Sequence, residues 1–353
     1  MKEKQMSENR ENSVVKNVLK IFTNEWNKQV ILYGPPGTSK TYSATIIAAA
    51  LLKGVSKDTI QDNMEETDLL KKIFETEEEA EVYAEAKKIL NENEKKYTLI
   101  QFHPSYSYED FVRGITVKVG NGDKVTYEVE RKVIDKFCDD NKEEKGPIVM
   151  IIDEINRAPL ASVLGELIYG LEYRGEEIST PYELGGTNKI EIPSNLYIIG
   201  TMNTADRSIG SIDYAVRRRF AFVQVKSEKS KIKDSWKKDK NGSEFVGKCA
   251  ARLYERLMDE NGIFAEDMLQ DTELDVEDIK IGHTYFLGKD DEGMEYLKYR
   301  IRYQIWPIYE EYIKDGIISN EGKARFAEIL EKKDFGKNFK SIAEEIRGKK
   351  NNS

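Results

Sequence analysis

The sequence is poor in cysteine and contains no long apolar run. Its two cysteines, Cys138 and Cys249, lie in unrelated contexts without metal-ligand spacing, which argues against a disulfide framework and against a zinc site. The longest apolar run near the N-terminus, Ala44 to Leu52, is about half of the roughly 18 residues that suggest a membrane span, and no signal peptide or transit segment precedes it. We therefore expect a soluble protein of a reducing compartment, the cytoplasm.

The chain also lacks an excess of basic residues. Its 353 residues include 55 Lys and Arg against 64 Asp and Glu, which gives a formal net charge of −9. This balance argues against a surface built mainly to grip duplex DNA, so any contact with nucleic acid should be local. The length suffices for one large or two modest domains with a substantial core.

Brief apolar runs separated by helical patterns begin at Gln29. They are VILY (30–33), TLIQF (98–102), IVMII (148–152), LYIIG (196–200) and AFVQV (221–225). Buried strands joined by helical crossovers predict an α/β fold with a five-stranded parallel sheet. A lysine-rich stretch at 226–242 ends this pattern. The lysines of 226–240 are typical of a solvated linker, and a patch that follows nucleic-acid phosphates is the alternative. The chain after it is mostly helical.

These patterns predict the organisation of the chain. We expect an N-terminal helical extension at 1–28, an α/β core at 29–226 and a C-terminal, mostly helical domain at 227–353. Within the core, an acidic segment at 57–96 carries apolar residues at helical spacing, which predicts a helical insert. Alternating apolar residues around a Gly-Asn-Gly-Asp turn predict a hairpin at 115–129.

The first predicted strand leads into a phosphate-binding loop motif and then a helix. The motif consists of Gly34, Pro35, Pro36, Gly37, Thr38, Ser39, Lys40 and Thr41. Loop N–H groups and the helix N-terminus would cradle nucleotide phosphates, Lys40 would reach the β and γ oxygens, and the Thr41 hydroxyl would bind Mg²⁺. Ser39 stands where the motif has its second glycine, so loop geometry and nucleotide affinity should differ from those of the glycine form.

Two carboxylates follow the strand predicted at 148–152. Asp153 and Glu154 should lie at the C-terminal edge of the sheet, where ligands of open α/β sheets bind. Asp153 would hold hydrated Mg²⁺, and Glu154 would orient and polarise the water that attacks the γ-phosphate. Paired acids also occur at ordinary helix starts, but the neighbouring phosphate loop favours the catalytic interpretation.

A polar run and an arginine run lie around the last two predicted strands. Asn203 could hold the attacking water, because its amide both donates and accepts hydrogen bonds; an Asx turn is the alternative. Three consecutive arginines, 217–219, cannot all face one direction. In a ring, one or two of them could reach the γ-phosphate of a neighbouring subunit as arginine fingers. A solvated helix end is the alternative.

Taken together, the chain resembles the AAA+ motor of the McrB family, the NTPase subunits of modified-cytosine-specific restriction systems. The strings that carry the resemblance are GPPGTSKT (34–41), QFHPSYSYEDFVRGI (101–115), IIDEINRA (151–158), IIGTMNTADRSI (198–209), DYAVRRRF (213–220) and IGHTYF (281–286). The resemblance implies an AAA+ P-loop NTPase core, a helical lid domain and a hexameric ring that hydrolyses GTP, or ATP in some relatives, with Mg²⁺. It also implies stimulation by an McrC-type endonuclease partner and translocation of DNA.

The resemblance further implies roles for individual residues. By this matching, Lys40 and Thr41 are the Walker A pair, and Asp153 and Glu154 are the Walker B pair. Asn203 and Asp206 belong to the signature loop, and Arg218 and Arg219 are the candidate arginine fingers. Family members carry a separate N-terminal domain that reads methylated DNA. Only residues 1–28 precede the first predicted strand, so we expect this chain not to recognise modified bases by itself.

Both histidines lie within these strings. His103 precedes Pro104 at a strand end, which favours a structural hydrogen bond. His283 lies where AAA+ proteins place sensor 2, but the usual arginine is missing, so contact with the nucleotide is the less favoured interpretation. The string NKIE (188–191) approximates the guanine-reading N-K-x-D motif, but it has Glu for Asp and precedes a predicted strand, so guanine recognition is not inferred from it.

Two other functions stay open. A MoxR or dynein-related AAA+ ATPase that remodels protein complexes would share the Walker, sensor 1 and arginine features, but would not be expected to show both MNTADRS and QFHPSYSYEDF. A non-hydrolysing, nucleotide-gated scaffold would not need Glu154, Asn203 or the arginines.

Overall fold

A computed structural model describes residues 13–119, 125–205, 212–236, 243–258, 269, 276–288 and 293–330. The chain divides into two compact units. The first contains the described residues of Met1–Tyr33 and Lys40–Gln224, and the second contains Gly34–Ser39 and the described residues of Val225–Ser353. The short segment Gly34–Ser39 therefore belongs to the second unit, although both of its chain neighbours belong to the first.

The first unit is built on a five-stranded sheet with the order β2-β5-β8-β1-β9. Its strands are β1 (Gln29–Gly34), β2 (Tyr97–Gln101), β5 (Ile148–Asp153), β8 (Leu196–Asn203) and β9 (Ala221–Gln224). The pairs β2-β5, β5-β8 and β1-β9 are parallel. The predicted α/β fold with a five-stranded parallel sheet is confirmed.

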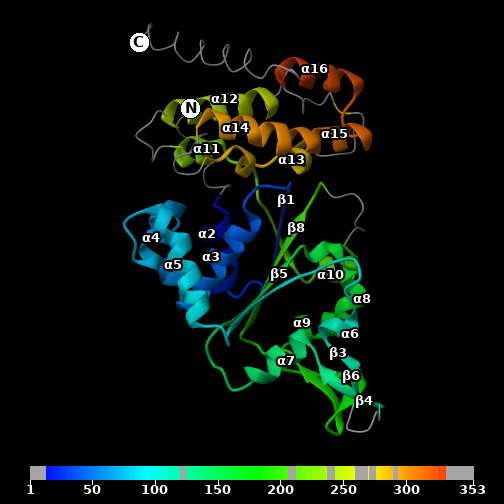
Figure 1. The fold of residues 1–353 in the computed structure, drawn as a ribbon. Coiled ribbons are helices and arrows are strands. Elements are labelled where there is room, and N and C mark those ends of the chain that lie inside the picture. Colours follow the sequence, from blue (N-terminus) through cyan, green and yellow to red (C-terminus); the bar gives the residue numbers. More distant parts are fainter. Residues whose placement is uncertain are drawn as a thin grey trace. The chain divides into compact units, whose positions relative to one another are not determined.

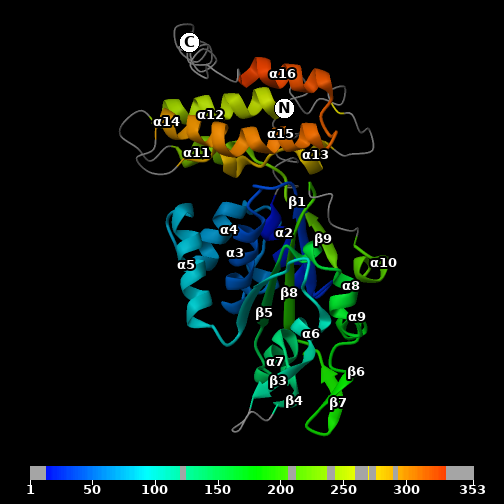
Figure 2. The ribbon, with the colours of Figure 1, turned by 45° about the vertical axis from the view of Figure 1, so that its right-hand side comes forward.

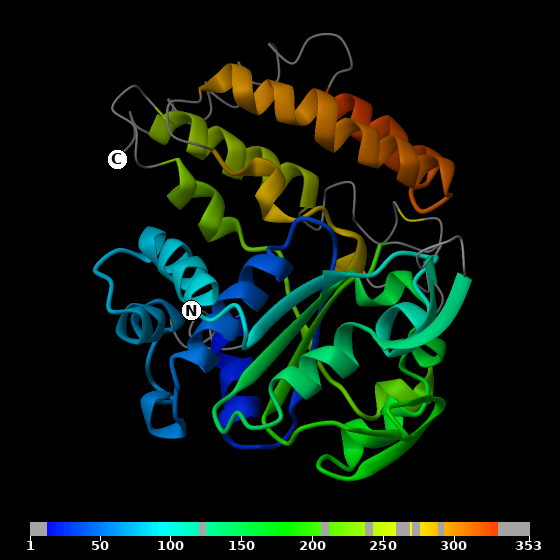
Figure 3. The same ribbon diagram turned by 60° about the horizontal axis from the view of Figure 1, so that its bottom comes forward.

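Helices cover both faces of this sheet (Figures 1 and 2). One face carries α2 (Val14–Thr23), α3 (Lys40–Leu52), α4 (Glu66–Phe74) and α5 (Glu79–Glu92). Figure 3 shows α4 and α5, in cyan, beside the blue α3. Because α3 packs between the sheet and its neighbouring helices, every residue from Ser43 to Leu51 is buried. The segment at 57–96 contains α4, α5 and a short 3-10 turn, Lys57–Thr59.

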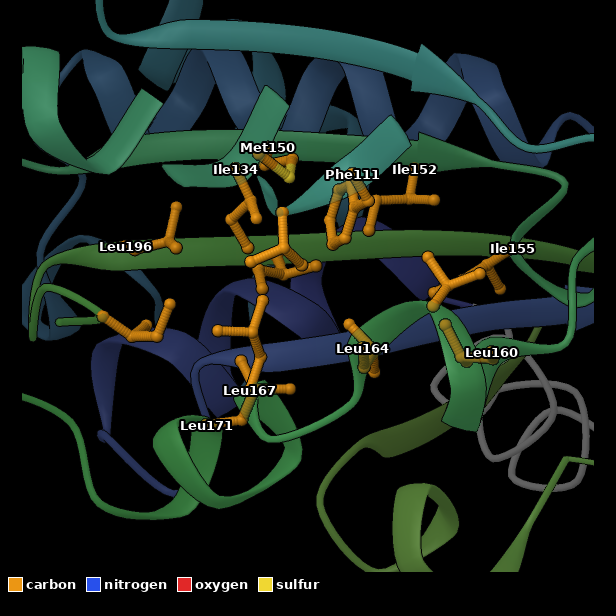
Figure 4. Packing of buried hydrophobic residues seen from close by; sticks show 14 of the residues in the cluster. Phe111, Ile134, Met150, Ile152, Ile155, Leu160, Leu164, Leu167, Leu171 and Leu196 are labelled. Carbon is orange, nitrogen blue, oxygen red and sulfur yellow. The ribbon is translucent and has the colours of Figure 1, made fainter. Parts of the chain in front are cut away.

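The opposite face carries a large apolar cluster. It is covered by α6 (Tyr108–Phe111), α7 (Val133–Asp140), α8 (Leu160–Leu164) and α9 (Leu167–Glu172). In Figure 4, Met150 and Ile152 of β5 lie among Phe111, Ile134 and Leu164 from these helices. This packing fixes the strand β5, and with it the two carboxylates at its end.

Two antiparallel hairpins extend from this unit. The first pairs β3 (Arg113–Val119) with β4 (Val125–Arg131), the two arms of the hairpin predicted at 115–129, whose turn at 120–124 lies outside the described residues. The second, β6 (Glu177–Leu184) with β7 (Thr187–Glu191), was not predicted. Its strand β7 contains the NKIE string at 188–191, which precedes β8 as predicted and itself lies in a strand.

Arg113 connects the two hairpins from a fully buried position. Its guanidinium donates to the Asp135 carboxylate on α7, over 2.5 Å. It also donates to the Thr180 hydroxyl over 3.1 Å and to the carbonyl oxygens of Tyr182 and Lys189. The buried charge is thus paired and hydrogen-bonded, as burial of an arginine requires.

The second unit is mostly helical. Its elements are α11 (Lys229–Ser235), α12 (Ser243–Met258), α13 (Val276–Ile279), the 3-10 helix η4 (His283–Phe286), α14 (Met294–Arg300), a π-helical stretch at Ile301–Ile305, α15 (Trp306–Lys314) and α16 (Asn320–Leu330). Figures 1 and 2 show α12 beside α14. Ile232 and Trp236 are buried in this unit, so the prediction of a solvated linker is wrong for α11 and its end. None of the helices described here is both long and apolar enough to cross a membrane.

Candidate nucleotide-binding site

The phosphate loop at 34–39 follows β1 and precedes α3. Three of its residues have positive φ angles: Gly34 at 155°, Gly37 at 78° and Ser39 at 70°. A Cβ on Gly34 would lie 2.4 Å from the Val225 carbonyl oxygen, so this position requires glycine. Ser39 is the one residue of the three with a side chain, and the left-handed conformation costs such a residue about 1–2 kcal/mol. The departure from the motif seen in the sequence is therefore a strained point of the loop.

A segment of the second unit holds this loop through the backbone. The N–H of Gly282 donates to the Pro36 carbonyl over 2.9 Å. The N–H of Thr284 donates to the Gly37 carbonyl over 3.0 Å. We call Gly282–Thr284 the loop clasp.

His283 lies in the middle of the loop clasp and is 1% exposed. Its Nε2 lies 3.1 Å from the Ser39 hydroxyl oxygen, and its Nδ1 accepts the N–H of Glu228 over 3.1 Å. Burial, together with the positive charge of Lys231, lowers the pKa of His283 to about 3. The imidazole is therefore neutral, and both of its ring nitrogens form hydrogen bonds within the protein.

His103 was predicted to form a structural hydrogen bond, but the structure shows a different environment. The residue is exposed, and its ring lies edge-on to Tyr106 with centroids 5.4 Å apart. Among the described residues its side chain has no hydrogen-bond partner, so the prediction is wrong for that part of the chain.

Thr41 and Asp153 lie together in the first unit. The Thr41 hydroxyl, on the first turn of α3, donates to Asp153 Oδ1 over 2.8 Å. The hydroxyl of Thr201, in β8, donates to the same oxygen, and it also accepts the N–H of Glu154 over 3.2 Å. Thr201 was missed from the sequence, because only the pairing of β8 with β5 places its hydroxyl beside Asp153. It positions both members of the carboxylate pair.

These oxygen atoms suit a magnesium ion, which prefers hard oxygen ligands and keeps several waters. Thr41 and Asp153 supply a hydroxyl and a carboxylate that already lie within hydrogen-bond distance of each other. Among the described residues no group of three or more His, Cys, Asp or Glu could hold a metal ion. A Mg²⁺ ion bound here would be held by these two side chains together with water and nucleotide phosphates, as is usual when it accompanies a triphosphate.

Glu154 and Asn203 form the second pair of this cluster. The Asn203 side-chain amide donates to Glu154 Oε1 over 2.6 Å. Arg157 places its Nε 3.4 Å from Glu154 Oε2. Glu154 itself has a φ of 54°, a left-handed conformation that is rare for a residue with a side chain. The structure thus brings together two residues that the sequence analysis predicts to act on the same attacking water.

Lys40 is buried at the start of α3. Burial lowers the pKa of its ammonium group to about 8, while the negative charges of Glu154 and Asp153 act in the opposite direction. The group therefore stays mainly protonated at pH 7. A partly desolvated cation of this kind is well suited to bind phosphate oxygens.

The three arginines differ in their surroundings. Arg217 is exposed and lies over the Phe222 ring at 5.4 Å from its centroid. Arg219 is occupied within the chain: its side chain is 9% exposed, pairs with Glu172 over 2.8 Å and donates to the Ala215 carbonyl. Arg218 is exposed, and its side chain has no hydrogen bond or ion pair with any other described residue. Asp206 lies outside the described residues.

Comparison with known proteins gives matches to one domain family and to restriction proteins. The family described as an AAA domain of the dynein-related subfamily matches residues 80–220. The type IV methyl-directed restriction enzyme EcoKMcrB subunit of Escherichia coli (strain K12) is 30% identical over 314 residues, which cover 86% of this chain and 57% of that protein. The type II restriction enzyme BsuMI component YdiS of Bacillus subtilis (strain 168) is 29% identical over 189 residues, or 43% of this chain and 55% of that protein.

A crystal structure of a protein from Cytophaga hutchinsonii is also similar, with 12% identity and a TM-score of 0.33 over 95% of this chain and 82% of that one. The chain spans less than two thirds of the length of either restriction relative. The domain match and the two relatives confirm the resemblance found in the sequence: the chain has an α/β AAA+ fold and is similar to the McrB-type subunits of restriction systems.

Proposed function

We propose that this chain is the motor of a McrBC-like DNA restriction system, which hydrolyses GTP or ATP and drives DNA translocation together with an McrC-type endonuclease. The observation that supports it best is the cluster of Thr41, Asp153, Glu154 and Asn203, joined by hydrogen bonds of 2.6 and 2.8 Å. Two relatives bear names of restriction enzymes. The cytoplasmic location predicted from the sequence belongs to the same proposal.

Each residue of the cluster has a role in the proposed hydrolysis. Lys40 binds the β and γ oxygens, and Thr41 with Asp153 holds Mg²⁺, which neutralises the charge on the phosphates. Glu154 accepts a proton from the attacking water, and Asn203 orients that water and the carboxylate. The water oxygen forms a bond to the γ-phosphorus as the bond to the β-γ bridging oxygen breaks, which gives the diphosphate and inorganic phosphate.

The proposed assembly is a homo-oligomeric ring of the hexameric type that the resemblance implies. Arg218 supports this part, because an exposed guanidinium beside the core can reach a phosphate of a neighbouring subunit. With a net charge of −9, DNA contacts in such a ring should be local.

The choice between GTP and ATP is tested by competition binding. Purified protein with Mg²⁺ is titrated with a fluorescent triphosphate, which is then displaced by GTP or by ATP. We expect one of the two to compete at least tenfold better. If neither displaces the probe, the proposed nucleotide function is wrong.

The match to the dynein-related subfamily favours a second candidate, an ATPase that remodels protein complexes. The two candidates differ in what stimulates turnover. A restriction motor should hydrolyse faster when an McrC-type partner and DNA are added together. Turnover that responds to a protein substrate, and stays unchanged with DNA and this partner, would support the remodelling candidate instead.

A further inference from the structure

The phosphate loop contains a serine whose side chain has a specific partner. Ser39 stands at the position where the phosphate-loop motif has glycine, and its φ of 70° is one that glycine adopts without cost. Its hydroxyl oxygen lies 3.1 Å from His283 Nε2. A glycine at this position could not form such a contact, so the pair belongs to the serine form of the loop.

The hydrogen bonds of His283 determine which ring nitrogen carries the proton. Because Nδ1 accepts the N–H of Glu228, the proton of the neutral imidazole is on Nε2. The imidazole therefore donates to the Ser39 hydroxyl. The burial of His283 keeps it neutral, and its orientation is fixed from both sides.

The backbone of the loop clasp acts on the same loop. Its bonds to the carbonyl oxygens of Pro36 and Gly37 turn both carbonyls toward the clasp. In a trans peptide the N–H of the next residue points the opposite way, so the N–H groups of Gly37 and Thr38 face away from the clasp. Those N–H groups are the donors that a phosphate-binding loop presents to phosphates.

The backbone of the loop clasp lies directly against the backbone of the phosphate loop. A Cβ placed on Gly282 would lie 1.9 Å from the Gly37 carbonyl oxygen, so any side chain there would displace the loop. The guanidinium of Arg300, on α14, donates to the carbonyl of Thr284 and so fixes the end of the loop clasp.

We propose that His283 is a positioning residue that holds Ser39 in its left-handed conformation, and that the loop clasp thereby orients the phosphate-binding N–H groups. The inference rests on the proposed nucleotide function of the loop. His283 acts through the Ser39 hydroxyl, with no contact of its own to the nucleotide.

A double-mutant cycle tests this role. The affinity for a fluorescent triphosphate with Mg²⁺ is measured for wild type, His283→Ala, Ser39→Gly and the double variant. We expect His283→Ala to weaken binding about fivefold to tenfold in the wild-type background, the usual effect of losing one hydrogen bond of this kind. In the Ser39→Gly background the same change should alter affinity less than twofold. An equal loss in both backgrounds would overturn the proposal, because it would mean that His283 contacts the nucleotide directly.

A second measurement needs no nucleotide. Hydrogen exchange is followed in nucleotide-free protein, where His283→Ala should speed exchange of the clasp amides at positions 282 and 284, which donate to the loop carbonyls, at least fivefold, but only when Ser39 is present. His283→Gln, which keeps an N–H donor at the end of the side chain, should restore part of the protection. Unchanged exchange in His283→Ala would refute the positioning role.

The binding and exchange measurements also separate the positioning role of His283 from the proposed nucleotide function. A wild-type protein that binds no triphosphate but shows the exchange pattern would refute the proposed function and leave the role of His283 supported. Gly282→Ala should reproduce the fast exchange, while Gly293→Ala is the matched control because a Cβ there meets nothing within 4 Å. If both glycine variants behave like wild type, the clasp does not hold the loop. Folding of each variant is checked by thermal unfolding, and Ser39→Ala, which removes the hydroxyl partner of His283, replaces His283→Ala if the latter fails to fold.

Discussion

The side-chain amide of Asn203 donates to Glu154 Oε1 over 2.6 Å, across the adjacent ends of β8 and β5. This bond orients the carboxylate that we propose as the acceptor of a proton from water. Glu154→Gln should leave nucleotide affinity within about threefold of wild type and slow turnover by about 10² to 10⁴, because an amide keeps the shape but cannot accept the proton. Steady-state phosphate release and equilibrium binding measure the two effects.

The control for this change is Glu183→Gln, at an exposed position of β6. It should hydrolyse nucleotide at the wild-type rate. Wild-type turnover in Glu154→Gln would refute the assignment of Glu154.

Thr201 gives a prediction about metal affinity. Its hydroxyl bonds to Asp153 Oδ1 and to the N–H of Glu154, so Thr201→Val removes an orienting partner without changing the side-chain volume much. We expect the Mg²⁺ concentration for half-maximal nucleotide binding to rise about 10-fold to 100-fold, the range for loss of a group that orients a metal ligand. Thr201→Ser should stay near wild type. An unchanged Mg²⁺ titration in Thr201→Val would show that Asp153 needs no such support.

Arg218 and Arg219 should differ in what their loss affects. Arg218→Ala should reduce turnover by about 10³ to 10⁵ with unchanged thermal stability, as expected for an arginine finger. Arg219→Ala should lower the free energy of unfolding by about 1–3 kcal/mol, because it leaves Glu172 and the Ala215 carbonyl without their partner. Calorimetry and phosphate release separate the two.

Mixing experiments test whether Arg218 acts across a subunit interface. Glu154→Gln and Arg218→Ala subunits, each inactive alone, are combined in one assembly. Some interfaces then pair an intact Glu154 with an intact Arg218, so partial activity should return. No activity in assemblies shown by mass to be mixed would exclude action in trans.

His283 should make folding stability depend on pH. Its pKa is about 3 in the folded protein and near 6.5 when unfolded, so the unfolded chain binds the extra proton as pH falls. Stability is therefore fully present above pH 6.5 and declines below it, by up to about 1.4 kcal/mol per pH unit. Urea unfolding at pH 7.5 and pH 5 should show a larger loss for wild type than for His283→Gln. Equal losses would contradict a buried neutral histidine.

The central strands β1, β5 and β8 could be predicted because strands buried on both faces are nearly continuous apolar runs. The positions of Asp153, Glu154 and Asn203 followed from the rule that ligands bind at the carboxyl ends of such strands. The β6-β7 hairpin could not be found in this way, since most of its residues are exposed and Pro181 interrupts the alternation.

The remaining features of the site could not be predicted because they depend on contacts between residues far apart in the sequence. Threonine is common in strands, so the sequence marks Thr201 only as a strand residue. Its hydrogen bond to Asp153 becomes visible only when β8 is placed beside β5. The pair between Arg219 and Glu172 joins separate segments of sequence that no local pattern connects. The bond from His283 to Ser39 spans an even larger separation, so Ser39 could be recognised as a departure from the motif but not as one half of a pair.

The burial of Arg113 also constrains the order in which the chain can fold. An unpaired guanidinium is costly to remove from water, so Arg113 cannot be buried before Asp135, Thr180 and Lys189 are in place. The strand β3, the helix α7 and the β6-β7 hairpin should therefore form and open as one cooperative unit. The whole segment behaves as a single folding step in which no hairpin reaches its final position alone.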